Sequence, residues 1–143
     1  MIQFLDSSAL VKRYIQERGS ELIRSLVSRR RDIATSRLSY VEISAALFRR
    51  ARAGDLSEES VKRHVGRLAR DLEEVQIVEI RPPVLELAVE LVQRHPLRAY
   101  DAVQLASALR LVRGAGLPVA FVCADSALSR AAGREGMRTQ CVS

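Results

Sequence analysis

Two hydrophobic patterns alternate along this chain. Short apolar runs, unbroken or alternating with polar residues, are typical of strands, and apolar residues spaced three or four positions apart are typical of amphipathic helices. The first pattern predicts five strands, at residues 2–5, 32–35, 75–80, 119–123 and 137–142. The second pattern predicts seven helices, at residues 9–16, 21–30, 39–53, 58–74, 84–94, 99–113 and 126–135.

The alternation of strands with helices predicts an α/β domain. Such a chain forms a parallel sheet with helices on both faces, and right-handed crossovers bring the C-terminal ends of its strands to one edge. The chain has 143 residues, 48% of them hydrophobic, which is enough for one core. We therefore expect residues 1–143 to form a single domain. The helices at 39–53 and 58–74 are longer than a crossover needs, so this pair is expected to project as an arm or a dimer surface.

The chain is basic, with 23 Lys and Arg against 17 Asp and Glu, and a formal charge of +6. Only Lys12 and Lys62 are lysines, and the planar guanidinium of arginine suits phosphate. The charge favours a polyanionic partner such as nucleic acid, although a general preference for arginine would give the same composition. No apolar run approaches the roughly 20 residues of a membrane span, and no signal peptide is recognisable, so a cytoplasmic protein is expected.

The cysteines and histidines do not suggest a site of their own. Cys123 and Cys141 are too few and too far apart for a disulfide framework or a zinc cluster, and each lies in an apolar run. We interpret both as small core residues. His64 and His95 lie in basic helical surroundings and are expected at the surface.

Four acids stand where predicted strands end or helices begin. Asp6 and Asp125 each follow an apolar run and precede a serine and a helix, whereas Glu42 and Asp101 lie in the first turns of helices. Carboxylates that converge at one sheet edge repel each other, and a hard divalent cation relieves the repulsion. An all-oxygen set without histidine suits Mg²⁺ or Mn²⁺. With a phosphodiester as substrate, a metal-bound water can become the nucleophile.

Three of these acids also have a simple structural interpretation. Asp6 and Asp125 can be helix N-caps, which stabilise a helix by about 1 kcal/mol. Ser39 and Glu42 have the spacing of a capping box. Asp101 is harder to explain in this way, because the residues that follow it are almost all apolar. Burial among them would raise its pKa unless a cation or a hydrogen-bond donor holds it charged.

Serines and bases near these acids have two interpretations each. The serines could orient metal-bound waters or could simply end helices; they are Ser7, Ser8, Ser36 and Ser126. The bases could guide a phosphate backbone toward the acids, or could be the ordinary cations of helix C-termini. They are Lys12, Arg13, Arg29, Arg30, Arg31, Arg49, Arg50 and Arg52.

Four segments, in this order, carry a resemblance to a known family: LDSSALVKRY, SRLSYVEISAAL, LRAYDAVQLASAL and FVCADSALSRAAGREG. Together they resemble PIN-domain ribonucleases of the VapC toxin type, and the resemblance covers essentially the whole chain. It implies a three-layer α/β/α PIN-like domain with a five-stranded parallel sheet. It also implies Mg²⁺- or Mn²⁺-dependent endonucleolytic cleavage of RNA, a homodimer, and inhibition by a VapB-type antitoxin.

The resemblance also assigns the site. Carried over to this chain, it makes Asp6, Glu42, Asp101 and Asp125 the metal-binding and catalytic acids. Some relatives have a further acid close to the fourth, whereas here Asp125 is the only acid between Asp101 and Glu135, so one or two metal ions remain open. Glu42 either ligates the ion or polarises the attacking water.

The expected function is a metal-dependent endoribonuclease that hydrolyses RNA phosphodiesters as the toxin of a type II toxin-antitoxin module. A phosphotransfer protein with Asp6 as phosphate acceptor is an alternative, but Ser8 stands where a second acid would be needed. A non-catalytic PIN-like module that binds RNA or protein is another, although all four acids are present. An RNA-processing nuclease outside a toxin-antitoxin pair is the third.

Overall fold

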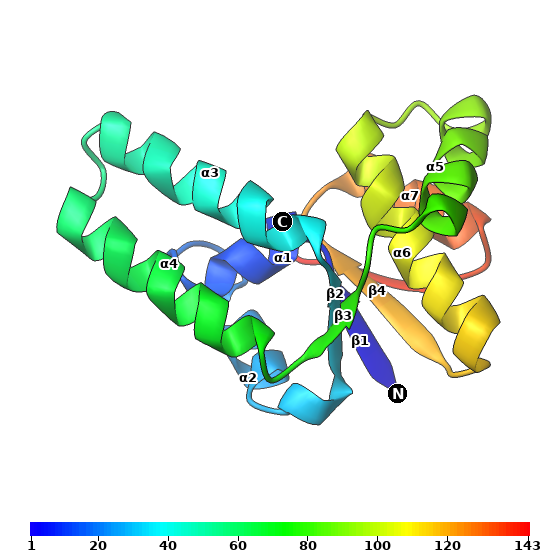
Figure 1. The fold of residues 1–143 in the computed structure, drawn as a ribbon, viewed down its shortest axis with the longest axis horizontal. Coiled ribbons are helices and arrows are strands. Elements are labelled where there is room, and N and C mark those ends of the chain that lie inside the picture. Colours follow the sequence, from blue (N-terminus) through cyan, green and yellow to red (C-terminus); the bar gives the residue numbers. More distant parts are fainter.

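The structure is a computed structural model that describes residues 1–143, and its five strands form one parallel sheet (Figure 1). The strands run in the order β3-β2-β1-β4-β5 across the sheet. Their bounds are Ile2–Leu5 for β1, Ile33–Ser36 for β2, Gln76–Val78 for β3, Val119–Cys123 for β4 and Arg138–Cys141 for β5. The predicted five-stranded parallel sheet is confirmed.

Helices cover both faces of the sheet, as predicted (Figure 1). One face carries α1 (Ser7–Leu10), α2 (Ser20–Val27), α3 (Leu38–Arg52) and α4 (Glu58–Leu72). The other face carries α5 (Pro82–Arg94), α6 (Ala99–Ala115) and α7 (Ser126–Arg134). Two short 3₁₀ turns, η1 (Val11–Arg13) and η2 (Arg30–Asp32), lie on the α1 to α4 side.

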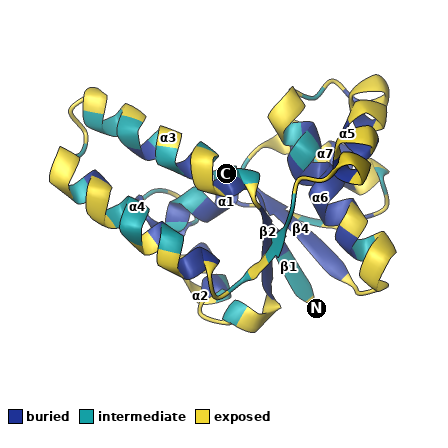
Figure 2. Ribbon diagram, in the orientation of Figure 1, coloured by how far each residue is buried: buried dark blue, intermediate teal, exposed yellow.

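A hydrophobic core lies on each face of the sheet. Successive side chains of a strand point to opposite faces, so Phe4 enters one core and Leu5 the other. Phe4 stacks on Phe121 at 5.7 Å between ring centroids, under α5, α6 and α7. Figure 2 shows the buried strands β2 and β4 between helices whose outer surfaces are exposed. No helix combines the length and apolarity that a membrane span requires.

The chain order reverses between β1 and β4, which are neighbours at the centre of the sheet. In open α/β sheets, ligands bind at such a switch point, outside the carboxyl ends of the strands. Asp6 directly follows β1, and Asp125 follows β4 after a single alanine. The fold therefore places two of the four predicted acids beside the expected ligand crevice.

Helices α3 and α4 pack against each other and project from the sheet, as expected (Figure 1). The base of this arm is tied to the chain after α1. Asp71 of α4 is buried, and its Oδ2 accepts hydrogen bonds from Arg13 Nε and Tyr14 Oη, both at 2.7 Å. The helix predicted at 9–16 begins at Ser7 and ends at Arg13 in the structure. It consists of α1 and the 3₁₀ turn η1.

Replacing Asp71 with Ala is expected to lower the free energy of unfolding by about 3 kcal/mol. The change leaves a mostly buried guanidinium and a buried phenol without their acceptor, and removing one partner of a buried pair is costly. Urea unfolding measures the loss. The exposed Asp55→Ala variant is the control and should change stability by no more than about 0.5 kcal/mol. Equal losses in both variants would contradict this role of Asp71.

Two side chains lie where the sequence did not predict them. His95 is buried rather than at the surface, because it packs beneath the end of α7 with its Nε2 2.6 Å from Glu135 Oε2. Cys123 is buried as predicted, but Cys141 is exposed. The reason is that Cys141 belongs to β5, an edge strand whose residues are mostly exposed.

Candidate active site

Three of the four predicted acids line one pocket at the carboxyl edge of the sheet. Asp6, Glu42 and Asp101 border a cavity of about 200 Å³, together with Ser7, Ser8 and other residues from α1, α3 and α6. Asp125 does not line this cavity and is exposed at the start of α7. Its charge nevertheless contributes to raising the pKa of Asp101, so it lies within electrostatic reach.

Asp6 is almost completely buried, with 2% of its surface exposed. Its Oδ1 accepts hydrogen bonds from Ser8 Oγ at 2.7 Å and from the Ala9 backbone N at 3.0 Å, which confirms that it caps α1. Its Oδ2 receives no hydrogen bond from the chain. Burial raises the pKa of Asp6 to about 7, and the charges of Asp101 and Glu42 add to the rise. The cap and a ligand role are therefore compatible, because they use different oxygens.

Asp125 caps α7 in the same way. Its Oδ1 accepts a hydrogen bond from the Leu128 backbone N at 3.0 Å. The capping interpretation is confirmed for both aspartates that follow strands. The second oxygen of Asp125 receives no hydrogen bond from the chain.

Glu42 is not part of a capping box, so that interpretation is wrong. Helix α3 begins at Leu38 without a side-chain cap. Glu42 Oε1 instead accepts hydrogen bonds from Ser7 Oγ at 2.5 Å and from Gln104 Nε2 at 2.9 Å. Donors from α1 and α6 thus turn the carboxylate toward the pocket, and its Oε2 remains free of hydrogen bonds.

Asp101 has no structural partner. No side chain or backbone group of the protein forms a hydrogen bond with its carboxylate, and no cation forms an ion pair with it. Burial raises the pKa of Asp101 to about 6, reinforced by the charges of Asp125 and Glu42, while Arg98 acts in the opposite direction. The acid that the sequence could not explain structurally remains without a structural role in the fold.

Gln104 is a site residue that the sequence analysis missed. Its side-chain nitrogen Nε2 lies 3.1 Å from Ser39 Oγ, and Ser39 Oγ lies 2.7 Å from Thr35 Oγ1. Thr35 must donate to the Leu5 carbonyl oxygen at 2.6 Å, because a carbonyl only accepts. Ser39 must then donate to Thr35 and accept from Gln104. This order fixes the amide, with Nε2 facing Ser39 and the carboxylate of Glu42.

The same orientation leaves Gln104 Oε1 buried without a partner. A buried unsatisfied oxygen of this kind costs about 1 to 3 kcal/mol, and such groups call for a functional explanation. A feature of the sequence could have identified Gln104. Gln104 is the only amide side chain in an otherwise apolar stretch of α6, one turn after Asp101.

The basic residues considered from the sequence differ in whether they are available to bind a phosphate. Arg49 lines the pocket with the acids. Lys12 is buried and bonded to Glu17 and to the Arg18 carbonyl, and Arg13 is bonded to Asp71, so neither is available to a phosphate.

Among the serines, Ser7 and Ser8 hold the acids in place. Ser36 Oγ accepts from the Leu38 backbone N at 3.1 Å, which is a helix-end role.

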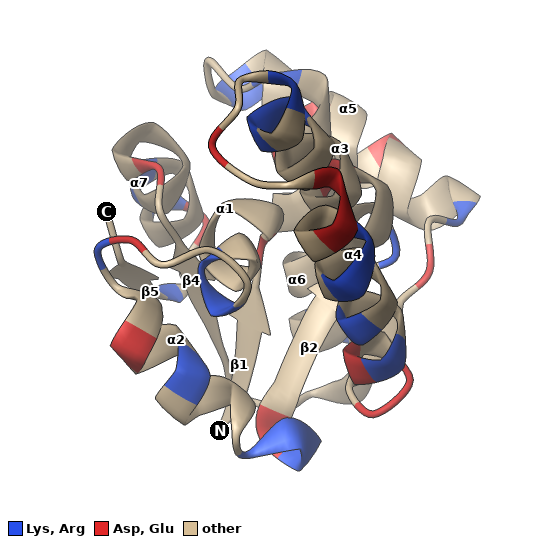
Figure 3. Ribbon diagram, turned by 90° about the vertical axis from the view of Figure 1, so that its left-hand side faces the viewer, with Lys and Arg blue, Asp and Glu red and all other residues tan.

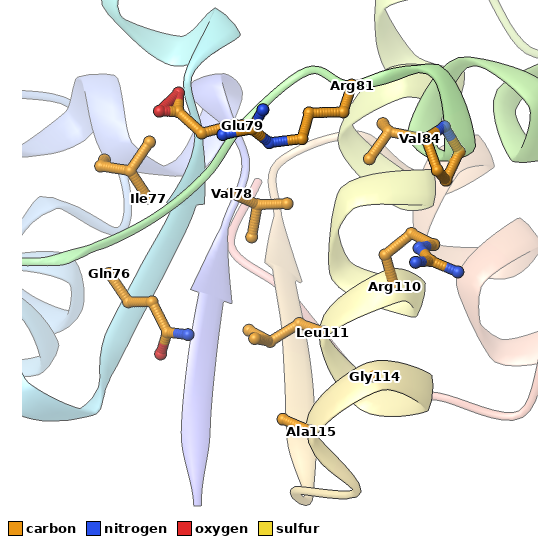
Figure 4. A pocket seen from close by; sticks show the side chains of 11 residues that line it. Gln76, Ile77, Val78, Glu79, Arg81, Val84, Arg110, Leu111, Gly114 and Ala115 are labelled. Carbon is orange, nitrogen blue, oxygen red and sulfur yellow. The ribbon is translucent and has the colours of Figure 1, made fainter.

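Another pocket lies between β3 and the second half of α6 and has a volume of about 360 Å³ (Figure 4). It contains none of the four predicted acids. Its one carboxylate, Glu79, is paired with Arg37 at 2.7 Å. The crowded carboxylates that could do chemistry are therefore in the pocket around Asp6.

The donor set of that pocket fits a hard divalent cation. No three carboxylate, imidazole or thiolate groups surround a single point in this structure. Mg²⁺ does not require such a cage, because it usually binds through one or two carboxylates and keeps several waters. The raised pKa values of Asp6 and Asp101 show that their negative charges are poorly compensated. A cation held by their free oxygens would supply that compensation.

Known proteins provide an independent comparison. A family model for the PIN domain matches residues 3–133. The chain is 39% identical over 121 residues to ribonuclease VapC45 of Mycobacterium tuberculosis (strain CDC 1551 / Oshkosh), covering 82% of this chain and 81% of that protein. PAE2754 from Pyrobaculum aerophilum aligns with a TM-score of 0.65 at 22% identity, over 97% of this chain and 89% of that one. VapBC-1 from nontypeable Haemophilus influenzae aligns with a TM-score of 0.63 at 16% identity, over 99% and 98%.

Proposed function

Because this chain belongs to the PIN-domain family, we propose that it is a metal-dependent endoribonuclease and the toxin of a type II toxin-antitoxin module, acting in the cytoplasm. One observation carries the proposal. Asp6, Glu42 and Asp101 share a pocket at the switch point of the sheet, and each has a carboxylate oxygen that no group of the chain occupies. The name of the VapC45 relative supports RNA as the substrate.

The four acids would hold Mg²⁺ or Mn²⁺, with Asp6, Glu42 and Asp101 in the pocket and Asp125 at its exposed side. When bound, the cation supplies neutralisation of phosphate charge and acidification of water. The chain itself does the positioning. Ser8 and the Ala9 backbone N hold Asp6, while Ser7 and Gln104 hold Glu42, so that the free oxygens need not reorient.

The pocket also has a residue suited to the substrate. Arg49 lines it from α3 and forms no ion pair with any acid of the chain. Its guanidinium could bind a phosphate oxygen next to the cleaved bond, because the fork of arginine matches phosphate geometry. It would also reduce the repulsion between the acids and the RNA backbone.

Cleavage of a defined RNA tests this proposal. The purified chain is incubated with an end-labelled single-stranded RNA and with DNA of the same sequence, each in Mg²⁺, Mn²⁺ or EDTA. Internal cleavage of the RNA alone, only in the presence of metal, is the expected result. Cleavage that continues in EDTA, or no cleavage of RNA by protein that binds Mn²⁺, would contradict the proposal.

Replacing Gln104 with Met is expected to weaken Mn²⁺ binding about 10- to 100-fold, because residues that hold metal ligands have effects of this size. Methionine keeps the length of the side chain but cannot donate to Glu42. It also removes the buried unpaired oxygen, which offsets the lost hydrogen bonds to Ser39 and Glu42, so the melting temperature should change little. Isothermal titration calorimetry and thermal unfolding measure the two effects.

The matched control for this change is Gln93→Met on the exposed side of α5. It should leave Mn²⁺ affinity unchanged. If Gln104→Met binds Mn²⁺ as tightly as the wild type, Gln104 has no positioning role.

A VapB-type antitoxin and a homodimer are further parts of the proposal. An antitoxin partner is expected because the chain is proposed to be a toxin, and its structural similarity to VapBC-1 supports this. Self-association is supported by α5, whose outer face exposes Leu85, Val89 and Val92 at helical spacing. Their exposed fractions are 46, 56 and 42%, which is unusual for three aligned aliphatic side chains on one helix.

A further inference from the structure

The outer face of α4 gathers positive charge over more than two helical turns. Residues 60–70 contain no Asp or Glu. An open hollow of about 590 Å³ lies along this stretch, and none of the residues that line it is hydrophobic. The lining residues are Lys62, Arg63, His64, Gly66, Arg67 and Arg70. Figure 3 shows Lys and Arg following one another along α4.

The charge of this face is not compensated within the chain. Lys62 lies 3.5 Å from Glu58, but both side chains are largely exposed. Arg63, Arg67 and Arg70 form no ion pair with any acid. Arg63 and Arg67 stand four residues apart on the helix, where like charges destabilise it. The Arg63–Arg67 spacing therefore disfavours the isolated helix rather than stabilising it.

Gly66 lies at the centre of the hollow, and the fold does not require a glycine there. A Cβ at this position would meet only Arg70 Nη1 at 3.8 Å, an ordinary contact, and the backbone has no positive φ. Glycine is less favourable than alanine inside a helix. Its one local effect is to leave the helix backbone open between the surrounding bases. A binding partner that approaches the backbone closely would explain this residue.

We propose that the α4 hollow binds the phosphodiester backbone of the RNA, as a second contact outside the carboxylate pocket. This inference rests on the proposed ribonuclease function. Contacts from arginine and lysine to phosphates position a nucleic acid without reading its sequence, and they need no apolar surface. The core of a protein interface is mostly apolar, which this hollow is not.

The test is RNA binding in EDTA, where cleavage cannot interfere. Fluorescence anisotropy of a labelled single-stranded RNA of about 20 nucleotides gives Kd as a function of KCl concentration. The variant combines Arg63→Gln, Arg67→Gln and Arg70→Gln. It is expected to bind about 10-fold more weakly at moderate salt. The slope of log K against log KCl concentration should become less steep by about 2. Each lost phosphate contact on a single strand removes roughly 0.7 from this slope.

A charge-matched control combines Arg31→Gln, Arg113→Gln and Arg134→Gln. These arginines are exposed, form no ion pair and lie outside the hollow. The control should weaken binding by less than about 3-fold, through net charge alone. Equal losses in the two triple variants, or no loss in the α4 variant, would overturn the proposal.

Gly66→Ala separates binding from folding. It should raise the melting temperature by about 2 to 4 °C, because alanine favours the helix, and should weaken RNA binding. Unchanged RNA affinity in this variant would overturn the role given to Gly66.

A polyglutamate peptide tests the other class of partner, an acidic protein. If it binds the wild type more tightly than RNA and not the α4 triple variant, the hollow belongs to an acidic protein and the proposal fails.

The two proposals can fail separately. If the wild type binds RNA through α4 but does not cleave it in Mg²⁺, the ribonuclease function is contradicted and the α4 site stands. If the wild type cleaves RNA and the α4 triple variant does so with the same KM, the α4 site is contradicted and the ribonuclease function stands.

Discussion

The Asp101→Asn variant is expected to cleave RNA roughly 10³-fold more slowly than the wild type, with the fold intact. A loss of this size corresponds to about 4 kcal/mol, which is the scale of charge stabilisation by a bound metal ion. Asparagine keeps the size of the side chain but removes the negative charge that a cation requires. The fold should tolerate it, because the carboxylate of Asp101 forms no hydrogen bond or ion pair in the chain.

Three measurements check this prediction together. They are the cleavage rate of a labelled RNA in Mg²⁺, the Mn²⁺ affinity and the melting temperature of the metal-free protein. Cleavage and Mn²⁺ affinity should fall together, whereas the melting temperature should stay equal or rise as one repulsive charge is lost from the pocket. Asp32→Asn at the exposed turn η2 is the matched control. An Asp101→Asn protein that cleaves RNA at the wild-type rate would rule out this site.

The Asp6→Asn variant is expected to be more stable than the metal-free wild type at pH 8, by about 4 kcal/mol. The pKa of Asp6 rises from an ordinary value near 4 to about 7 in the folded protein. The folded state therefore holds more protons than the unfolded state between these values, and stability falls as pH rises from about 4 to 7. Asparagine carries no charge, so it avoids this loss while its side-chain oxygen can still cap α1.

Urea unfolding in EDTA at several pH values measures this effect. The difference in unfolding free energy between Asp6→Asn and the wild type should open between pH 4 and 7 and stay constant above. Asp55→Asn, in the exposed α3–α4 loop, should show no such trend. A difference that does not change with pH would show that burial does not raise the pKa of Asp6.

Local patterns predicted most of the fold because the structures concerned are local. The strand at 119–123 is a continuous apolar run, and the observed β4 has the same bounds. The caps by Asp6 and Asp125 each need a backbone N–H only three residues away. Positions at strand ends and near helix starts predicted that acids would gather at one edge, and the structure brings Asp6, Glu42 and Asp101 to one pocket there, because parallel topology brings strand ends to one edge.

The remaining errors arose where distant residues decide the outcome. Ser39 and Glu42 have the spacing of a capping box, but Ser7 and Gln104, 35 and 62 residues from Glu42, hold its carboxylate instead. His95 could be recognised as buried only with Glu135, 40 residues further on. Gln104 was missed for the same reason, since the acceptors of its Nε2 group, Ser7, Ser39 and Glu42, come from α1 and α3, far along the chain. Sequence spacing cannot reveal such partners.

The strand order has a consequence for synthesis of this protein on the ribosome. The first strand to emerge, β1, occupies the centre of the sheet, but its neighbour β4 is made only after residue 118. Asp101 and Gln104 also emerge after two thirds of the chain. A nascent chain therefore carries Asp6 and Glu42 without the rest of the pocket. Under the proposed function, the nascent chain would have no assembled site for cutting the message or the ribosomal RNA beside it until synthesis is nearly complete.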